Sequence, residues 1–496
     1  GQLVLSMDGL DGDSADDGSK PGTQIALPQK ASNTLIPEPI LNALRGKTQP
    51  QTFLAGLQSF SIIDAEIQIR DHAIAESLML HNANLGVSRS PAGLLATLYG
   101  TLETPTENTD ISGSVSVFRD TERIETKLNF GPLDTNLPIR YLPDLVFYLP
   151  DMTISGQLGV DFNFQGQPIR ATSRLNSAAG SIELDATPNG ALPAATLNAT
   201  FDAFDAAVWL GGLYDVENVV AYMPRVPISG TATTQLNDQG LPRDITAELT
   251  SRIGDISLTA QPSEETGGLT GSILFTGLDA DTISQTAPKL GLLDGVTVRV
   301  DGSADFALDP QMKPLSGRVD INFGSGQLPG IPDVMETVPD LLWGRLAARL
   351  SPDDNVITLE NLTLDFSNPE ENISGPSISL TGSARPAETG MDIDLNGLVL
   401  DLPMNRLPAF WPETLAPNPR EWVTDNIPEA DVHQAGIAAS LSIPDMDPQQ
   451  ITINSLSGGI EFDQAQVHYL RPLPPATGVA GLAEFTDTSF ATDITA

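Results

Sequence analysis

The sequence Ile228-Ser229-Gly230, followed twelve residues later by Pro242 and twelve after that by Gly254, occurs in several copies along the chain. One copy lies 74 residues earlier, at Ile154, Gly156, Pro168 and Gly180. Two copies lie later: the first at Val300, Gly302, Pro314 and Gly326, and the second at Gly436, Pro448 and, slightly early, Gly458. We name this pattern the ISG repeat. Such a period indicates units that bury their apolar faces only against their neighbours. The wide gap before the last copy predicts one degenerate copy around 340–400.

From about residue 51, apolar and polar residues alternate with a period of two. This alternation is typical of antiparallel strands with one apolar and one polar face. Turn sequences at 165–168 and 237–242 predict that the strands are joined as hairpins. The expected apolar lining consists of Ile154, Leu158, Val160, Phe162, Phe164, Val296, Val298, Val300, Phe306, Leu308, Val319, Ile321, Phe323, Ile393 and Leu395.

Short helical segments are expected between the groups of hairpins, at 140–149, 204–222, 282–293, 333–350 and 420–427, with 333–350 the most helix-like. Helices this short cannot cover so many strands, and the aromatic content of 5% is low for a large conventional core. A sheet that curls and keeps its inside apolar solves this problem. The sequence therefore predicts a mainly β fold: an elongated, curled antiparallel β-sheet groove built of repeated hairpins with short interspersed helices.

An exposed apolar groove normally marks a binding surface. Its occupant should be linear and apolar, and acyl chains fit because burial contributes about 0.8 kcal/mol per CH₂. The same alternation is also typical of the dry core of a sandwich or a β-helix. A structural or adhesive β-solenoid surface protein is thus the alternative from a different class. Internal volume distinguishes the two, because a solenoid fills its interior and a groove leaves a cavity.

Composition excludes several classes of function. The chain has 25 Lys+Arg against 64 Asp+Glu, a net charge of -39, which argues against nucleic acid and against broad adhesion to anionic headgroups. Without cysteine there is no disulfide, thiolate metal site or cysteine nucleophile. No apolar stretch reaches the roughly 18–20 residues that span a bilayer. The chain begins at Gly1 and ends at Ala496 within a strand-like pattern, so we expect a piece of a longer protein.

The sequence offers no catalytic centre. The spacing between the four histidines is not that of metal ligands. The four are His72, His81, His433 and His468. Residues 45–48 look like the end of a phosphate-binding loop, but Leu41 occupies the position that requires glycine. We therefore expect no enzyme activity, no cofactor, no metal and no catalytic residue.

One segment resembles a known family. Residues 407–427 place Trp411 and Trp422 around several prolines, and a short helical stretch then leads to a strand that opens at Gly436. This element resembles the signature of the AsmA-like superfamily, in its YhdP-type branch. Residues 459–469, 473–475 and 478–481 also resemble that family, in which a strand ending near tyrosine precedes a proline-rich link. Residues 428–435 depart from the family pattern, in which glycine follows the helix closely.

The resemblance covers about 407–482 and implies a bridge-like lipid transport protein with a repeating β-groove. Such proteins are anchored in the inner membrane of Gram-negative bacteria, extend through the periplasm and carry phospholipid toward the outer membrane. The implied partners are phospholipid acyl chains, a membrane reached through an anchor outside this fragment, and envelope proteins. A regulator of envelope assembly that binds proteins without carrying lipid is a further alternative.

Three regions follow from these patterns. Residues 1–50 form an acidic, Pro- and Gly-rich loop or the start of the groove. Residues 51–405 form the repeating β-groove units, and residues 406–496 form the signature element and a following, truncated groove repeat. Within that element, Trp411 and Trp422 could gate lipid, but we expect both to pack as core and to fix the helix to the sheet.

Overall fold

The computed structural model describes residues 2–6, 58–71, 76–104, 108–141, 149–190, 193–212, 220, 223–240, 242–287, 295–310, 313–328, 339–351, 356–367, 375–387, 389–411, 417–444 and 451–495. Of the described residues, 69% lie in strands and 9% in helices, so this part of the chain is mainly β. It divides into two compact units: unit 1 is Gly1–Val220 with Arg225–Arg243, and unit 2 is Ala221–Pro224 with Asp244–Ala496. Most of the region 1–50 lies outside the described residues.

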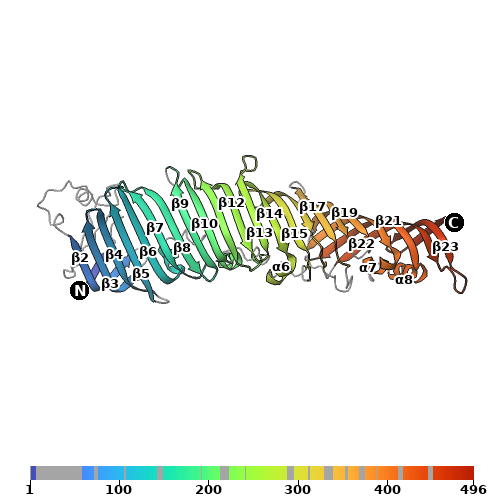
Figure 1. The fold of residues 1–496 in the computed structure, drawn as a ribbon, viewed down its shortest axis with the longest axis horizontal. Helices are drawn as coiled ribbons and strands as arrows, with labels where there is room; N and C mark the ends of the chain where they lie inside the picture. The colour runs from blue at the N-terminus through green and yellow to red at the C-terminus, as the bar shows by residue number, and fades with distance from the viewer. Residues whose placement is uncertain are drawn as a thin grey trace. The chain divides into compact units, whose positions relative to one another are not determined.

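Unit 1 is an antiparallel sheet in which consecutive strands are neighbours (Figure 1). A parallel strand, β1, is added beside β2. No pairing among the described residues joins the first strands to β11, so the sheet is open. The strands are β1 (Gln2–Ser6), β2 (Ser59–Asp71), β3 (Glu76–Ser90), β4 (Gly93–Glu103), β5 (Asn108–Phe118), β6 (Arg123–Asp134), β7 (Thr153–Asn163), β8 (Pro168–Ser177), β9 (Gly180–Pro188), β10 (Ala195–Phe204) and β11 (Ile228–Leu236).

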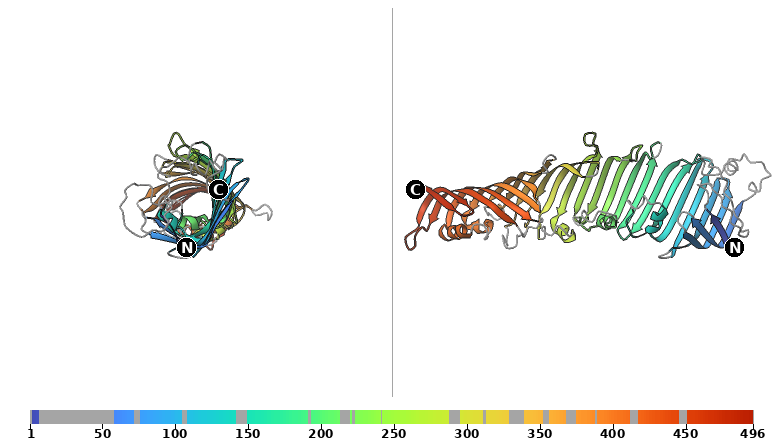
Figure 2. Two further views of the ribbon diagram at one scale, coloured as in Figure 1. Left: turned by 90° about the vertical axis from the view of Figure 1, so that its left-hand side faces the viewer. Right: turned by 180° about the vertical axis from the view of Figure 1, so that it is seen from behind.

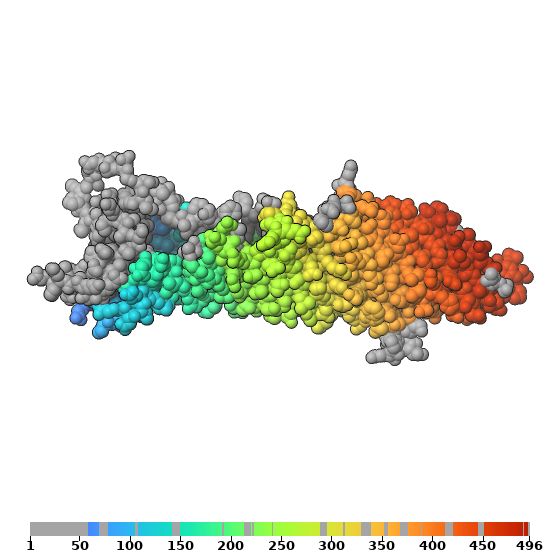
Figure 3. Space-filling view, turned by 90° about the horizontal axis from the view of Figure 1, so that it is seen from above, coloured from blue at the N-terminus to red at the C-terminus, as the bar shows by residue number. Residues whose placement is uncertain are grey.

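Unit 2 begins within β12 and follows the same plan through β24. Among the described residues, each strand of unit 2 pairs only with its neighbours in the chain. The space-filling view shows the residues of unit 2 in chain order up to the C-terminal residues (Figure 3). The prediction of a mainly β, antiparallel sheet that is not closed into a barrel and carries few short helices is confirmed. The strands are β12 (Pro242–Ser251), β13 (Gly254–Pro262), β14 (Leu269–Asp279), β15 (Arg299–Leu308), β16 (Pro314–Phe323), β17 (Trp343–Ser351), β18 (Val356–Asp365), β19 (Ser377–Ala387), β20 (Gly390–Pro403), β21 (Glu429–Pro444), β22 (Thr452–Val467), β23 (Ala476–Thr486) and β24 (Phe490–Thr495).

The ISG repeat marks a contact between a bulged strand and the strand that follows it. The glycine of each of three copies pairs with a phenylalanine just before a register shift: Gly156 with Phe130, Gly230 with Phe201, and Gly302 with Phe275. A Cβ atom on Gly302 would lie 2.8 Å from Cζ of Phe275 and 2.4 Å from the carbonyl oxygen of Asp320. At Gly302, glycine is needed because a ring and a backbone carbonyl occupy the space that a side chain would take. The prolines of these copies begin the next strands, β8, β12 and β16.

Short helices follow the bulged strands, and aspartate residues fix where two of them begin. The helices of this kind are α3 (Asn136–Tyr141), α4 (Ala206–Gly211) and α6 (Ala280–Thr286). The Asp205 carboxylate accepts hydrogen bonds from the backbone N–H groups of Ala207 and Val208, and Asp279 accepts one from Thr282. Such N-caps satisfy donors that the first turn of a helix leaves unpaired. At α4 and α6, the bulge and its aspartate thus end a group of strands.

The expectation of a helix over 333–350 is wrong where the structure describes it, because β17 (Trp343–Ser351) is a strand; 333–338 lie outside the described residues. The leucine and alanine content favours a helix locally, but neighbouring strands decide the outcome. Leu346 pairs with both Ile321 and Leu362. On the other face, Arg345 donates to Asp320 at 2.7 Å. The alternation of Arg and apolar residues therefore serves two faces of a sheet.

Thr135 offers a stability test in unit 1. Its buried hydroxyl donates to the carbonyl oxygen of Pro150 at 2.7 Å and accepts from the backbone N–H of Met152 at 3.1 Å, which fastens α3 to the start of β7. Thr135→Val keeps the shape and leaves both backbone groups without this partner. We expect a loss of about 1–2 kcal/mol in the free energy of unfolding, measured in urea. Unchanged stability would mean that the hydroxyl does not hold this junction.

Candidate functional site

The sheet of unit 1 has one apolar and one polar face, as the register shows. Residues directly opposite each other on paired strands lie on the same face. One such row across β3 to β7 is Leu85, Leu98, Gly113, Leu128 and Leu158. The adjacent row on the other face is polar, and across β4 to β6 it is Thr97, Ser114 and Lys127. We name the first surface the apolar face of unit 1.

This apolar face is not fully covered by the rest of the protein. Val115, Leu128 and Leu158 keep 39%, 41% and 39% of their surface exposed. A hollow of about 410 Å³ lies on the face over β3 to β7. Its lining residues are Leu85, Ala96, Leu98, Val115, Leu128, Leu158 and Val160, together with Gly113, Gly159, Thr97, Ser114, Thr126 and Lys127. The hollow presents hydrocarbon over several strands and is suited to an apolar ligand.

The opposite face carries ion pairs between neighbouring strands. Arg123 contacts Asp161 at 2.6 Å, and Arg170 forms a bidentate pair with Asp185 in unit 1. In unit 2, the Arg345 guanidinium donates to Asp320 and holds the pKa of that carboxyl below its usual value. These pairs are partly exposed, so each contributes little to stability. Their effect is to keep charge on one side of the sheet.

The predicted lining residues lie on the apolar faces of β7, β15, β16 and β20 or next to these strands. Leu158 and Val160 border the hollow of unit 1, and Leu395 borders a cavity in unit 2. Four of the predicted residues are instead buried beneath other side chains: Ile154, Phe164, Val296 and Val298. The prediction omitted β3 to β6, although the alternation of Leu94, Leu98 and Leu102 carries the same signal.

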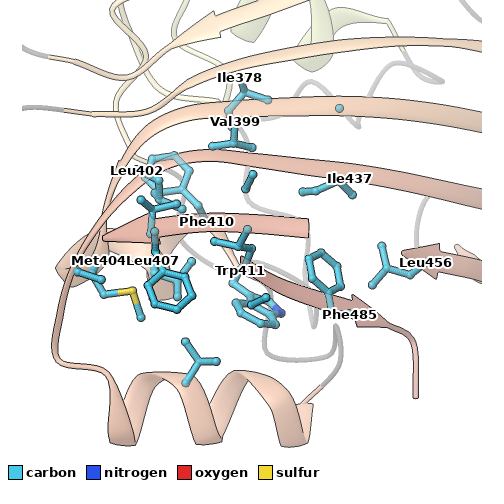
Figure 4. Close-up of a pocket in the computed structure, with 18 of the residues that line it drawn as sticks. Ile378, Val399, Leu402, Met404, Leu407, Phe410, Trp411, Ile437, Leu456 and Phe485 are labelled. Atoms are coloured by element: carbon cyan, nitrogen blue, oxygen red, sulfur yellow. The ribbon is translucent and has the colours of Figure 1, made fainter. Parts of the chain in front are cut away.

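Unit 2 contains a more enclosed apolar cavity of about 260 Å³. Its floor comes from β19 to β24, and a cap closes one side (Figure 4). The cap consists of η3 (Met404–Arg406), α7 (Leu407–Phe410) and α8 (Pro417–Asn426), at the same end of the strands as α6 (Figure 2). Residues that border the cavity from the cap and the loop after it are Met404, Leu407, Phe410, Trp411, Val423 and Ile427. The sequence did not predict this cavity.

Hydrogen bonds to backbone carbonyl oxygens hold the parts of the cap together and attach the cap to the segment that follows β22. Arg420 donates to the carbonyl oxygen of Trp411 at 2.8 Å, which joins α8 to the end of α7. The backbone N–H of His468 donates to Asn426 at 2.8 Å, and Arg471 donates to the carbonyl oxygen of Asp425 at 3.0 Å. Hydrogen bonds at the end of α8 therefore fasten the cap to the segment after β22, in addition to its apolar contacts.

The two tryptophans of the cap region have different surroundings. Trp411 is buried, with 9% of its surface exposed, and its ring lies 6.3 Å from that of Phe485. Trp422 is 43% exposed, because its neighbour Val423 takes the inward position on α8. The expectation of core packing is confirmed for Trp411 and wrong for Trp422. Trp411 also borders the cavity, as Figure 4 shows.

No helix among the described residues is long and apolar enough to cross a bilayer. Comparison with known proteins gave no assignment: no family model matches the chain, and no curated protein does.

Proposed function

We propose that this chain binds the acyl chains of phospholipids on its apolar faces and carries them along the sheet. In this proposal it is a periplasmic segment of a bridge-like protein of a Gram-negative envelope. The full protein is tethered to the inner membrane, and the phospholipids it carries support the integrity of the outer membrane. The resemblance of residues 407–482 to the AsmA-like superfamily suggests this setting.

The observation that carries the proposal is the exposed apolar face of unit 1. Val115, Leu128 and Leu158 lie on the inward face of an open sheet and yet remain about two-fifths exposed. A solenoid with a dry core would bury such residues, because its interior is filled. Covering them with hydrocarbon contributes about 25 cal/mol per Å² of apolar surface removed from water. This observation favours the groove over the solenoid.

The arrangement supports passive movement. Contacts between an acyl chain and Leu, Val or Ala side chains are non-directional, so a chain can shift along the face without breaking specific bonds. Charged groups such as Arg170 and Asp185 occupy the opposite face. Headgroups would therefore stay in water at the open edge, and the direction of transport would come from outside this segment.

A charge on the apolar face should displace lipid. We expect Leu158→Asp to lower the amount of phospholipid that co-purifies with the chain, because it weakens lipid binding on the apolar face of unit 1 about tenfold, equivalent to ~1.4 kcal/mol. A carboxylate against hydrocarbon without a partner costs more than this. Native mass spectrometry with lipid extraction measures the content. Gln157→Asp, on the neighbouring residue of the polar face, is the matched control and should retain lipid.

Wild-type protein that is folded, β-rich and free of lipid would contradict the proposal and favour the dry solenoid. So would equal lipid content in Leu158→Asp and the control. Circular dichroism and thermal unfolding of both variants establish that they are folded.

A further inference from the structure

We infer that the cavity between β19–β24 and the cap of unit 2 is a discrete, saturable site for a single hydrocarbon tail. It differs from the open face of unit 1, on which the proposed function gives lipids no fixed position. The inference rests on the proposed function only for the identity of the ligand as a lipid acyl chain.

The size of the cavity suits one tail. Its lining comes from six adjacent strands, β19 to β24. At about 4.8 Å between adjacent strands, six strands span about 24 Å of sheet. One leaflet of a bilayer has a hydrocarbon thickness of about 15 Å, half of the ~30 Å core. A single tail is therefore long enough to cross several of the strands that line the cavity.

The chemistry of the walls selects a tail rather than a headgroup. Among the described residues that line the cavity, none is charged and Thr492 is the one polar side chain. A phosphate or a carboxylate inside would lose its hydration without gaining a partner. The charged or polar end of the ligand must therefore remain outside the cavity.

The cap makes this a site rather than a stretch of open face. Met404, Trp411 and Val423 are buried and cover the floor from above. The space beneath the cap residues is left by small residues on the floor, among which are Gly397, Ala435, Ala439 and Ala483. A bound tail would contact Trp411 from the cap side and Ala439 from the floor. The emission of the Trp411 indole can therefore report whether the cavity is occupied.

The test is a titration of tryptophan emission with dibromostearate, whose bromine atoms quench an indole on contact. For the wild-type chain we expect a saturable component at one probe per chain, and this component should be missing in Trp411→Phe. Ala439→Phe fills the cavity and should weaken the component about tenfold, equivalent to ~1.4 kcal/mol. Ala438→Phe is the matched control, because Ala438 pairs with Asn396 and Ser457 on the opposite face.

Ala439→Leu adds less volume and gives the same test if the phenylalanine variant does not fold. Equal binding by the variants at 439 and the control at 438 would overturn the inference. Lipid content of the wild type separates the two proposals. Co-purified phospholipid without a saturable component contradicts only the capped site, whereas a saturable component without any phospholipid contradicts only the transport proposal.

Discussion

Trp411→Ala should lower the free energy of unfolding of unit 2 by about 3–5 kcal/mol, the usual cost of removing a buried large side chain. Trp411 belongs to the largest cluster of buried residues in unit 2, together with Leu402, Leu407 and Val423. It also lies against Phe485 of β23, so its loss removes a contact between the cap and the last strands of the sheet. Urea unfolding followed by circular dichroism measures the change.

The control for this experiment is the second tryptophan of the same element. Trp422→Ala removes the same number of atoms from a side chain that is already 43% exposed, and we expect a loss below about 1 kcal/mol. Similar losses for the two variants would show that Trp411 is not the residue that fixes the cap. A larger loss at Trp422 would assign the structural role to the exposed ring.

Gly302→Ala should destabilise unit 2 by about 3 kcal/mol, although it adds one methyl group. That methyl group would lie 2.4 Å from a backbone oxygen, that of Asp320, and 2.8 Å from the ring of Phe275. The ring can turn, but the carbonyl belongs to a paired strand and cannot move without disturbing β15 and β16. The expected result is a lower urea midpoint at an unchanged slope.

Gly317→Ala is the matched control on the same face of the next strand. A Cβ atom there meets nothing closer than 3.4 Å, which is ordinary van der Waals contact. We expect this variant to be as stable as the wild type or more stable by about 0.5–1 kcal/mol, because alanine restricts the unfolded chain more than glycine does. If both variants had the same stability, crowding by the paired strand would not explain the glycine of the ISG repeat.

The strands could be predicted from the sequence because each carries its own signal. Leu158 and Val160 alternate with Gly159 and Asp161, and a period of two depends only on local residues. The same reasoning failed for 343–350, where leucine and alanine suit either structure locally. There the partners Asp320 and Leu362 decide, and they lie on other strands.

The capped cavity could not be predicted for a similar reason. It exists because Trp411, which follows β20, reaches Phe485 of β23 across two intervening strands. Nothing in residues 407–427 specifies which strands will lie beneath them. The inward position of Val423 rather than Trp422 depends on how α8 is rotated on the sheet, and that rotation is fixed by contacts such as Arg471 with Asp425.

The Phe–Gly contact between a bulged strand and its successor has a consequence for how such proteins change over generations. Gly156, Gly230 and Gly302 stand four strands apart and each makes the same kind of pair. Duplication of a gene segment that encodes four strands would therefore place a phenylalanine opposite a glycine at each end of the new copy, as in the existing copies. Length can be gained or lost in whole copies without inventing a new contact, so selection can match the number of copies to a distance.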